Sequence, residues 1–246
     1  MADAFVEALA SDAGRLAESA RQGVLVTILD LADWCRFQDE APALLDEAEV
    51  ARARRQRNPR NRDALVLTYA LHRLLLSNVL RCAPGEVGVR RDDKGCPRLP
   101  GGAWHTSLSH SADRVAFAVS MTGPVGIDIE PADRAAEMDA IAERVVHRDE
   151  LAALAGLSAV ARDRALLDLW VRKEALLKAA GIGLECAMET FTAPVGVPLQ
   201  LPGERFAGRE TSLQMVDAGR DWACAAATPP GARIARVLAK EPQGPC

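Results

Sequence analysis

Two long helical segments, one in each half of the chain, constrain the fold more than any other feature of the sequence. Residues 63–81 contain no glycine or proline and carry leucines at helical spacing. A second such segment covers residues 160–180, and Gly181 provides its C-terminal stop. Between and around these helices lie short runs of strand length, at 24–29, 87–90, 114–120, 125–130 and 222–228. Helices and strands in both halves predict the α+β class.

Turn residues near 122–126 predict the division of the chain. A length of 246 residues suits one large domain or two small ones. We expect an Ala-rich helical N-terminal extension at 1–22, an N-terminal α+β half at 23–122 and a C-terminal α+β half at 123–246. Further helices are expected at 44–53 and, as one long helical region, at 133–155.

Composition excludes several classes of protein. Hydrophobic residues make up 49% and charged residues 26% of the chain, enough for a packed core. The net charge of −4 argues against a uniformly basic nucleic-acid binder. The chain has no apolar run near the roughly 18 residues that span a bilayer and no zinc-ligand spacing of its cysteines. Its N-terminus lacks the basic-then-apolar order of a signal peptide. We therefore expect a cytoplasmic protein without nucleic-acid or membrane partners.

Two carboxylates share one face of the strand predicted at 125–130. Side chains alternate in a strand, so Asp128 and Glu130 lie opposite the apolar face, with Cα atoms roughly 6.5 Å apart. Two carboxylates this close repel each other unless a cation lies between them, and Mg²⁺ suits such oxygen ligands. The alternative is a solvated polar strand face.

The helix predicted at 160–180 carries a third candidate carboxylate. Glu174 and Lys178 follow Trp170 at steps of four residues and therefore lie on neighbouring turns of one face. Glu174 is a candidate metal ligand and Lys178 a candidate phosphate contact. The alternative is a surface ion pair of a few tenths of a kcal/mol.

A histidine between two serines precedes the strand predicted at 114–120. Ser109, His110 and Ser111 offer several hydrogen-bond donors, which suits a phosphate oxygen. A Ser/His nucleophile pair is disfavoured because neighbouring strand residues point apart and the chain has no G-x-S-x-G turn. A structural or merely exposed histidine is the alternative.

A dense basic segment follows the helix predicted at 44–53. It has six arginines in eleven residues and no acid: Arg52, Arg54, Arg55, Arg57, Arg60 and Arg62. Such a concentration on an acidic protein indicates a polyanionic ligand or an acidic protein partner, since arginine binds two oxygens at once. The alternative is a solvated face.

The order of these motifs resembles that of the 4′-phosphopantetheinyl transferases of the Sfp type. That family has an S-H-S segment, then a G-[IV]-D-[IV]-E strand, then a W-x-x-K-E-A-x-x-K helix. The corresponding segments here are 109–111, 126–130 and 170–178. The resemblance covers roughly residues 45–230 and implies a pseudo-twofold α+β monomer with a coenzyme A site between the halves.

The family moves the phosphopantetheine arm of coenzyme A to a serine of an apo acyl or peptidyl carrier protein. The resemblance therefore implies a Mg²⁺-dependent holo-[acyl-carrier-protein] synthase that releases adenosine 3′,5′-bisphosphate. It implies Asp128, Glu130 and Glu174 as the Mg²⁺ ligands. Alternatives are a non-catalytic coenzyme A-binding or carrier-binding module on the same scaffold, and another Mg²⁺-dependent phosphotransferase.

The resemblance also implies the residues that contact the substrate. His110 and Lys178 match phosphate contacts, with Ser109 beside them, and Glu174 is the candidate for accepting the serine proton. The family's G-K-P turn reads Gly-Cys-Pro at 95–97, so its lysine is missing, and Lys94 or Arg98 is the candidate replacement. Among the arginines, the candidates for the nucleotide phosphates are Arg55 and Arg62.

Overall fold

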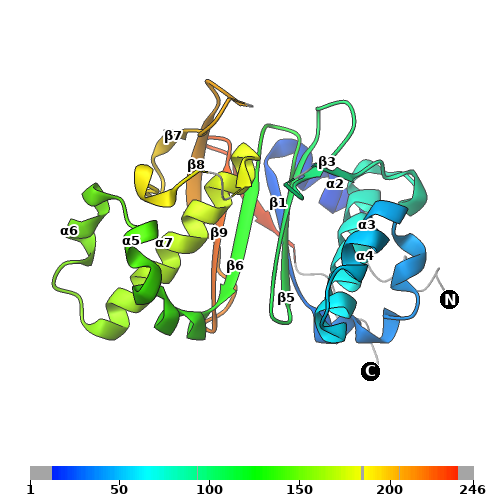
Figure 1. Cartoon of the computed structure of the whole chain (residues 1–246). Coiled ribbons are helices and arrows are strands. Elements are labelled where there is room, and N and C mark those ends of the chain that lie inside the picture. Colours follow the sequence, from blue (N-terminus) through cyan, green and yellow to red (C-terminus); the bar gives the residue numbers. More distant parts are fainter. Residues whose placement is uncertain (1–12, 93, 184–185, 205, 238–246) are drawn as a thin grey trace.

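Two four-stranded sheets lie side by side, with helices on their outer sides (Figure 1). The computed structural model describes residues 13–92, 94–183, 186–204 and 206–237. The strand order is β10-β1-β5-β4 in the first sheet and β6-β9-β8-β7 in the second. This mixture of helices and largely antiparallel sheets confirms the α+β class, whereas the pseudo-twofold relation stays a prediction.

The first sheet is built around β5. Its strands are β1 (Val24–Asp30), β4 (His105–Ser111), β5 (Arg114–Ser120) and β10 (Ile234–Arg236). β4 and β5 form a hairpin, β1 pairs antiparallel with β5, and β10 pairs parallel with β1. Residues 234–236, which belong to the predicted C-terminal half, therefore complete the sheet of the N-terminal half.

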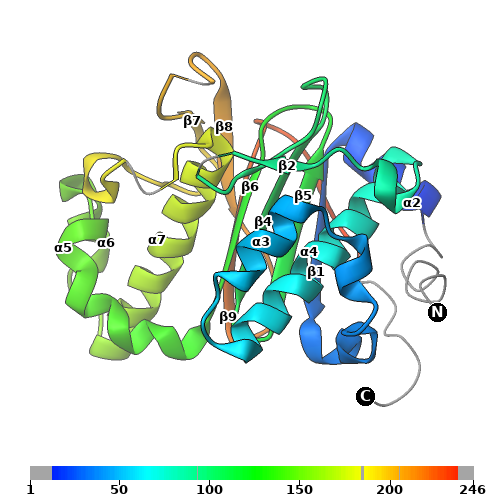
Figure 2. The same cartoon turned by 45° about the vertical axis from the view of Figure 1, so that its right-hand side comes forward.

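A long helix covers the outer face of the first sheet (Figure 2). It is α4 (Pro59–Leu80), where Asn58 accepts a hydrogen bond from Arg60 N–H as the N-cap. Leu71 and Leu75 of this helix pack with Phe117 of β5 in one buried cluster. The flanking helices are α2 (Ala13–Gln22), α3 (Glu47–Arg54) and the 3₁₀ turns η1 (Leu31–Phe37), η2 (Ala41–Leu44) and η3 (Pro84–Glu86). α2 buries Leu16 and Ala20 in the same cluster, so the described part of the predicted N-terminal extension packs onto this half.

The second sheet carries the second long helix. Its strands are β6 (Gly126–Pro131), β7 (Pro198–Gln200), β8 (Glu210–Met215) and β9 (Trp222–Thr228). α7 (Ala159–Ala180) begins at the N-cap Ser158 and ends at Gly181, which has the left-handed φ of 69° that glycine tolerates. Leu177 of α7 packs with Leu213 and Ala225 of the sheet.

The inner faces of the two sheets form a third buried cluster. Val26 and Ala118 of the first sheet meet Ile127, Ile129 and Ala226 of the second. This contact holds β4 close to β6, although the two strands belong to different sheets. The interface between the sheets is therefore apolar on the inside and leaves the other face of β6 for polar groups.

Three expectations are corrected by the structure. The strand expected at 87–90 is instead a two-residue pair of β2 (Arg90–Arg91) with β3 (Pro97–Arg98). Residues 105–111 form the strand β4, which sequence analysis treated only as a segment before a strand.

The helical region expected at 133–155 is the third correction, because it is broken into short pieces. They are η4 (Ala132–Ile141), α5 (Ala142–Val145), η5 (Arg148–Glu150) and α6 (Leu151–Leu154). A further 3₁₀ turn, η7 (Met188–Thr190), lies outside this region, after α7. The break at Val145 leaves its carbonyl for the buried ammonium of Lys173, and Glu150 accepts a bond from His147 N–H as the chain re-enters a helical turn. Within the described ranges, no helix is long and apolar enough to cross a lipid bilayer.

Candidate functional site

The polar face of β6 lies against helix α7. Ile127 and Ile129 are fully buried between the sheets, as the alternation predicts, so Asp128 and Glu130 face away from that core. A Cβ on Gly126 would lie 1.9 Å from the Ala175 carbonyl oxygen of α7. Only glycine permits this approach, which places the middle of α7 directly over the carboxylates.

Asp128 is held by a lysine and a serine from two other elements. The Lys178 Nζ of α7 lies 2.6 Å from Asp128 Oδ1, and the Ser109 hydroxyl of β4 donates to the same oxygen at 2.7 Å. Lys178 also donates to Ser109 at 2.9 Å, which closes a triangle. Burial raises the pKa of Asp128, and the charge of Lys178 opposes this rise. Among the described residues, none hydrogen bonds the buried Asp128 Oδ2.

Glu130 is engaged at both of its oxygens. The Ser111 hydroxyl donates to Oε2 at 2.6 Å, and the Arg134 guanidinium pairs with Oε1. The Arg134 guanidinium also lies over the Trp170 ring of α7, 5.1 Å from the ring centroid. Ser107, on the same face of β4, accepts a hydrogen bond from the Ile127 amide. Alternate serines of β4 therefore bridge to β6.

Glu174 completes the acidic cluster. Burial, together with the negative charges of Asp128 and Glu130, raises the pKa of Glu174 to about 7, while Lys178 opposes the rise. A carboxyl group with this pKa exchanges a proton near neutrality.

The three carboxylates fit a divalent cation chemically. In the described part of the chain, no group of three His, Cys, Asp or Glu side chains is arranged to hold a metal ion. Asp128 nevertheless has a buried oxygen without a hydrogen-bond partner among the described residues, and the charges of Asp128 and Glu130 add to the effect of burial on the pKa of Glu174. A hard cation would satisfy that oxygen and reduce the repulsion between the acids. Carboxylate oxygens are the ligands that Mg²⁺ prefers, whereas Lys178 and Arg134 already engage two of these three carboxylates.

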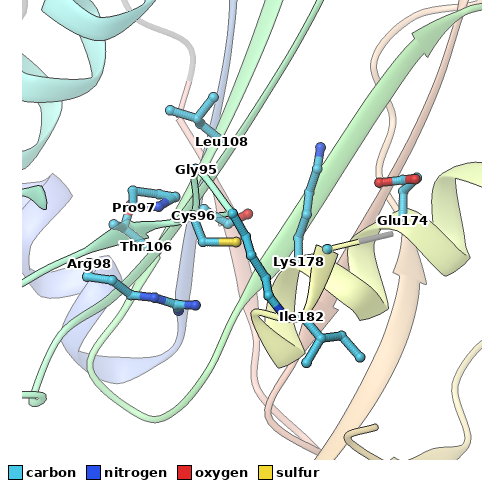
Figure 3. A pocket seen from close by; sticks show the side chains of 12 residues that line it. Gly95, Cys96, Pro97, Arg98, Thr106, Leu108, Glu174, Lys178 and Ile182 are labelled. Atoms are coloured by element: carbon cyan, nitrogen blue, oxygen red, sulfur yellow. The ribbon is translucent and has the colours of Figure 1, made fainter. Parts of the chain in front are cut away.

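A pocket of about 530 Å³ opens between the two halves beside this cluster. Figure 3 shows Cys96, Arg98 and Thr106 on one side and Glu174 and Lys178 of α7 on the other. The remaining residues of the lining are Lys94, Gly95, Pro97, Ser107, Leu108, Ile182 and Gly183. The pocket thus joins the predicted Lys94, Glu174 and Lys178 in one cavity.

Arg98 lies in the same turn as Lys94. Its guanidinium pairs with Asp92 at 2.8 Å. Both candidate replacements for the missing turn lysine therefore line the pocket, with the Cys96 side chain between them.

His110 lies on the other face of β4 from the serines that touch β6. His110 lies four residues after Thr106 and therefore on the same face of the strand. The Thr106 hydroxyl forms a hydrogen bond with the His72 ring of α4 at 2.8 Å. Burial lowers the pKa of His110, and among the described residues none hydrogen bonds its buried Nε2. A phosphate contact by His110 stays a prediction.

The two predicted arginines lie in different surroundings. Arg55 lines a second pocket, of about 700 Å³, with Arg52, Arg90 and Arg91, and acidic side chains of α3 share its lining. A Cβ on Gly95 would lie 2.4 Å from the Arg52 guanidinium, so Arg52 packs against the turn that borders the first pocket. Arg62 is partly exposed and pairs with Asp63 at 3.6 Å.

Two residues of the site were missed by sequence analysis. Arg134 had no local signal, because Glu130 lies on the strand β6 and the four-residue spacing of a helix face does not apply there. Lys173 is the first lysine of the W-x-x-K-E-A-x-x-K motif, but no feature of that motif indicates that its side chain is buried. Its Nζ is fully buried, donates to the carbonyls of residues 145, 188 and 191, and pairs with Glu150 at 2.7 Å. Lys173 thereby anchors the loops beside α7 at the position directly before Glu174.

Comparisons with known proteins agree with the resemblance. Residues 124–227 match the 4′-phosphopantetheinyl transferase superfamily. The chain is 30% identical over 153 residues to 4′-phosphopantetheinyl transferase HetI of a Nostoc species, covering 61% of this chain and 64% of that protein. It is 40% identical over 94 residues to 4′-phosphopantetheinyl transferase psf-1 of Bacillus pumilus, covering 37% of this chain and 38% of that protein. The chain thus spans less than two thirds of the length of these relatives.

Proposed function

We propose that this chain transfers the phosphopantetheine arm of coenzyme A to a carrier protein. Residues 124–227 match the 4′-phosphopantetheinyl transferase superfamily, and this match supports the proposal. The acceptor is a serine of an apo acyl or peptidyl carrier protein, and the second product is adenosine 3′,5′-bisphosphate. The observation that carries the proposal is the pocket between the halves, where Glu174 and Lys178 line the wall beside Asp128.

Asp128, Glu130 and Glu174 are the residues that we propose to hold Mg²⁺. Bound there, Mg²⁺ neutralises the charge on the pyrophosphate of coenzyme A. The support is the unsatisfied Asp128 Oδ2, together with the pKa of Glu174, which is raised by burial and further by the charges of Asp128 and Glu130.

Lys178 and Ser109 act as hydrogen-bond donors in this proposal. Lys178 lines the pocket, and the N–H that it gives to neither Asp128 nor Ser109 is available to a phosphate oxygen. Ser109 donates its one hydroxyl hydrogen to Asp128 and would turn away from that oxygen to donate to a phosphate. His110 is a further proposed phosphate contact. Lys94 and Arg98 supply positive charge on the opposite wall, where the family has its turn lysine, and Arg55 and Arg62 extend that charge to the nucleotide phosphates.

Glu174 is the proposed acceptor of the serine proton. The carrier serine oxygen forms a bond to the β-phosphorus while the bond from that phosphorus to the nucleotide side breaks, and Glu174 takes the hydroxyl proton. The place of Glu174 in the pocket wall supports this role. Its pKa of about 7 is that of the metal-free site, and a bound cation would lower it.

Intact mass spectrometry tests the reaction. The protein is mixed with an apo carrier protein, coenzyme A and Mg²⁺, and we expect the carrier to gain one phosphopantetheine group on serine. Asp128→Ala and Glu174→Ala are expected to abolish the gain with an unchanged circular dichroism spectrum. Asp168→Ala removes an acid from the same helix that pairs with Arg164 at 3.0 Å, and is expected to retain transfer.

Two outcomes contradict the proposal. An unmodified carrier protein together with tight binding of coenzyme A favours a non-catalytic binding module, for which the cysteine in the turn at 95–97 is the supporting feature. Phosphate release from simple nucleotides, without carrier modification, favours another phosphotransferase.

A further inference from the structure

Glu130 is paired with a cation that the proposed function does not use. Arg134 of η4 follows Glu130 of β6 by four residues, and its guanidinium pairs with Oε1 while Ser111 donates to Oε2. We infer that Arg134 is the resident counter-ion of Glu130 and opposes the binding of a divalent cation at this carboxylate. The inference rests on the proposed function, since it takes Glu130 as a ligand of that cation.

The surroundings of Arg134 hold it in place without burying it. Its guanidinium lies 5.1 Å from the centroid of the Trp170 ring, an attractive geometry for a cation over an aromatic face. The Arg134 side chain is 31% exposed and the Glu130 side chain 12% exposed. Arg134 therefore has a path to solvent, whereas Glu130 has little water to replace its partner.

The two strand carboxylates differ in a way that points to Arg134. Asp128 keeps one buried oxygen without a hydrogen-bond partner in the described part of the chain, although Lys178 pairs with the other. Glu130 has both oxygens engaged. A cation entering the cluster finds an open oxygen on Asp128, but at Glu130 it must displace or tolerate a guanidinium.

Either event costs binding free energy. A guanidinium and a divalent cation at one carboxylate repel each other, and a displaced guanidinium loses its ion pair and its contact with Trp170. Linkage requires that the cation and the Arg134 contact weaken each other equally. Arg134 thus lowers the affinity of the empty site for the cation, whether its guanidinium stays at Glu130 or is displaced.

The test measures metal binding rather than turnover. Mn²⁺ serves as the probe, and its free concentration is followed by electron paramagnetic resonance in the absence of coenzyme A. We expect Arg134→Gln to bind Mn²⁺ about tenfold more tightly than the wild type, a factor within the usual range for coupling between neighbouring sites. Arg134→Lys, which keeps the charge, is expected to stay within about twofold of the wild type.

A matched control removes an arginine from an ion pair elsewhere. Arg162 pairs with Asp139 at 3.3 Å in an exposed position, and Arg162→Gln is expected to leave Mn²⁺ binding unchanged. An unchanged or weaker affinity in Arg134→Gln overturns the inference, because Arg134 then only orients Glu130. An equal gain in Arg162→Gln also overturns it, since the effect is then one of net charge.

Asp128→Ala separates this inference from the proposed function. If Asp128→Ala abolishes Mn²⁺ binding and Arg134→Gln does not alter it, the counter-ion role alone is wrong. If Mn²⁺ binding survives in Asp128→Ala, or if neither the wild type nor Arg134→Gln binds Mn²⁺, the metal assignment is wrong and the inference is lost with it.

Discussion

Individual side chains of the site acquire their chemistry from neighbours on other elements. Glu174 alone is an ordinary helical glutamate, yet burial beside Asp128 and Glu130 raises its pKa to about 7. Lys178 and Ser109 meet at Asp128 although 69 positions of sequence separate them. Gathering these acids without a bound cation therefore lowers the free energy of unfolding at high pH.

Glu174→Gln is expected to stabilise the metal-free protein at high pH. Between about pH 4.5 and 7 the folded state keeps the Glu174 proton that the unfolded state has released, so the stability of the wild type falls as the pH rises through this range. Glutamine carries no charge and escapes that loss. Urea unfolding in EDTA should show equal stabilities near pH 4 and an advantage of about 3 kcal/mol for Glu174→Gln at pH 8.

Asp168→Asn serves as the control for this measurement. Asp168 lies on the same helix and pairs with Arg164 at the surface, so its substitution should leave the shape of the pH profile unchanged. Parallel profiles for the wild type and Glu174→Gln would show that Glu174 titrates normally.

The sequence predicted which acids gather but not what accompanies them. Alternation along β6 placed Asp128 and Glu130 on one face, and helical spacing placed Glu174 and Lys178 on another, because both patterns depend only on local geometry. The partners Ser109, Ser111 and Arg134 depend on how β4 and η4 pack against β6, which no local period encodes. The same reason hides the burial of Lys173.

At the scale of elements, the site depends on the close approach of β6 and α7. Both were predicted within a few residues of their observed ends, since each has a strong period and clear terminal signals. The prediction of one long helical segment at 133–155 was wrong, because the chain breaks at Val145, whose carbonyl accepts a hydrogen bond from Lys173. The strand β4 was missed because its serines and histidines have low strand propensity and gain their stability from β5 and β6.

Gly126→Ala tests the approach of these two elements. The added Cβ would lie 1.9 Å from the Ala175 oxygen and 2.6 Å from the Ala179 nitrogen, both backbone atoms that no rotamer change can move. We expect a loss of about 2–3 kcal/mol in unfolding free energy, typical of overpacking, measured by urea denaturation.

Gly85→Ala is the matched control for Gly126→Ala. A Cβ at Gly85 meets no atom within 4 Å, so its unfolding free energy should change by less than about 0.5 kcal/mol. Equal stabilities of the two variants would mean that α7 is free to shift away from β6, and that the glycine is not needed for the contact.

At the scale of the whole molecule, charge is distributed unevenly over an acidic protein. The chain carries a net charge of −4, yet Arg54, Arg57 and Arg60 lie exposed at the corner between α3 and α4. This corner belongs to the same half as the turn at 94–98 that borders the pocket. A basic surface on this half attracts an acidic partner over distances of about a Debye length and accelerates its encounter.

The last prediction is that this exposed basic corner serves the carrier protein rather than coenzyme A. Neutralising Arg54, Arg57 and Arg60 together with glutamine should lower kcat/KM for an acidic carrier protein about tenfold at low salt and flatten its dependence on ionic strength, because long-range attraction acts mainly on the association rate. The KM for coenzyme A should stay unchanged, since Arg55, which lines the second pocket, remains. Replacing Arg148, Arg162 and Arg220, three arginines outside this corner that pair with aspartates, controls for net charge. A wild-type rate insensitive to salt, or an equal loss in that control, would assign the basic corner to nucleotide contact or to bare surface.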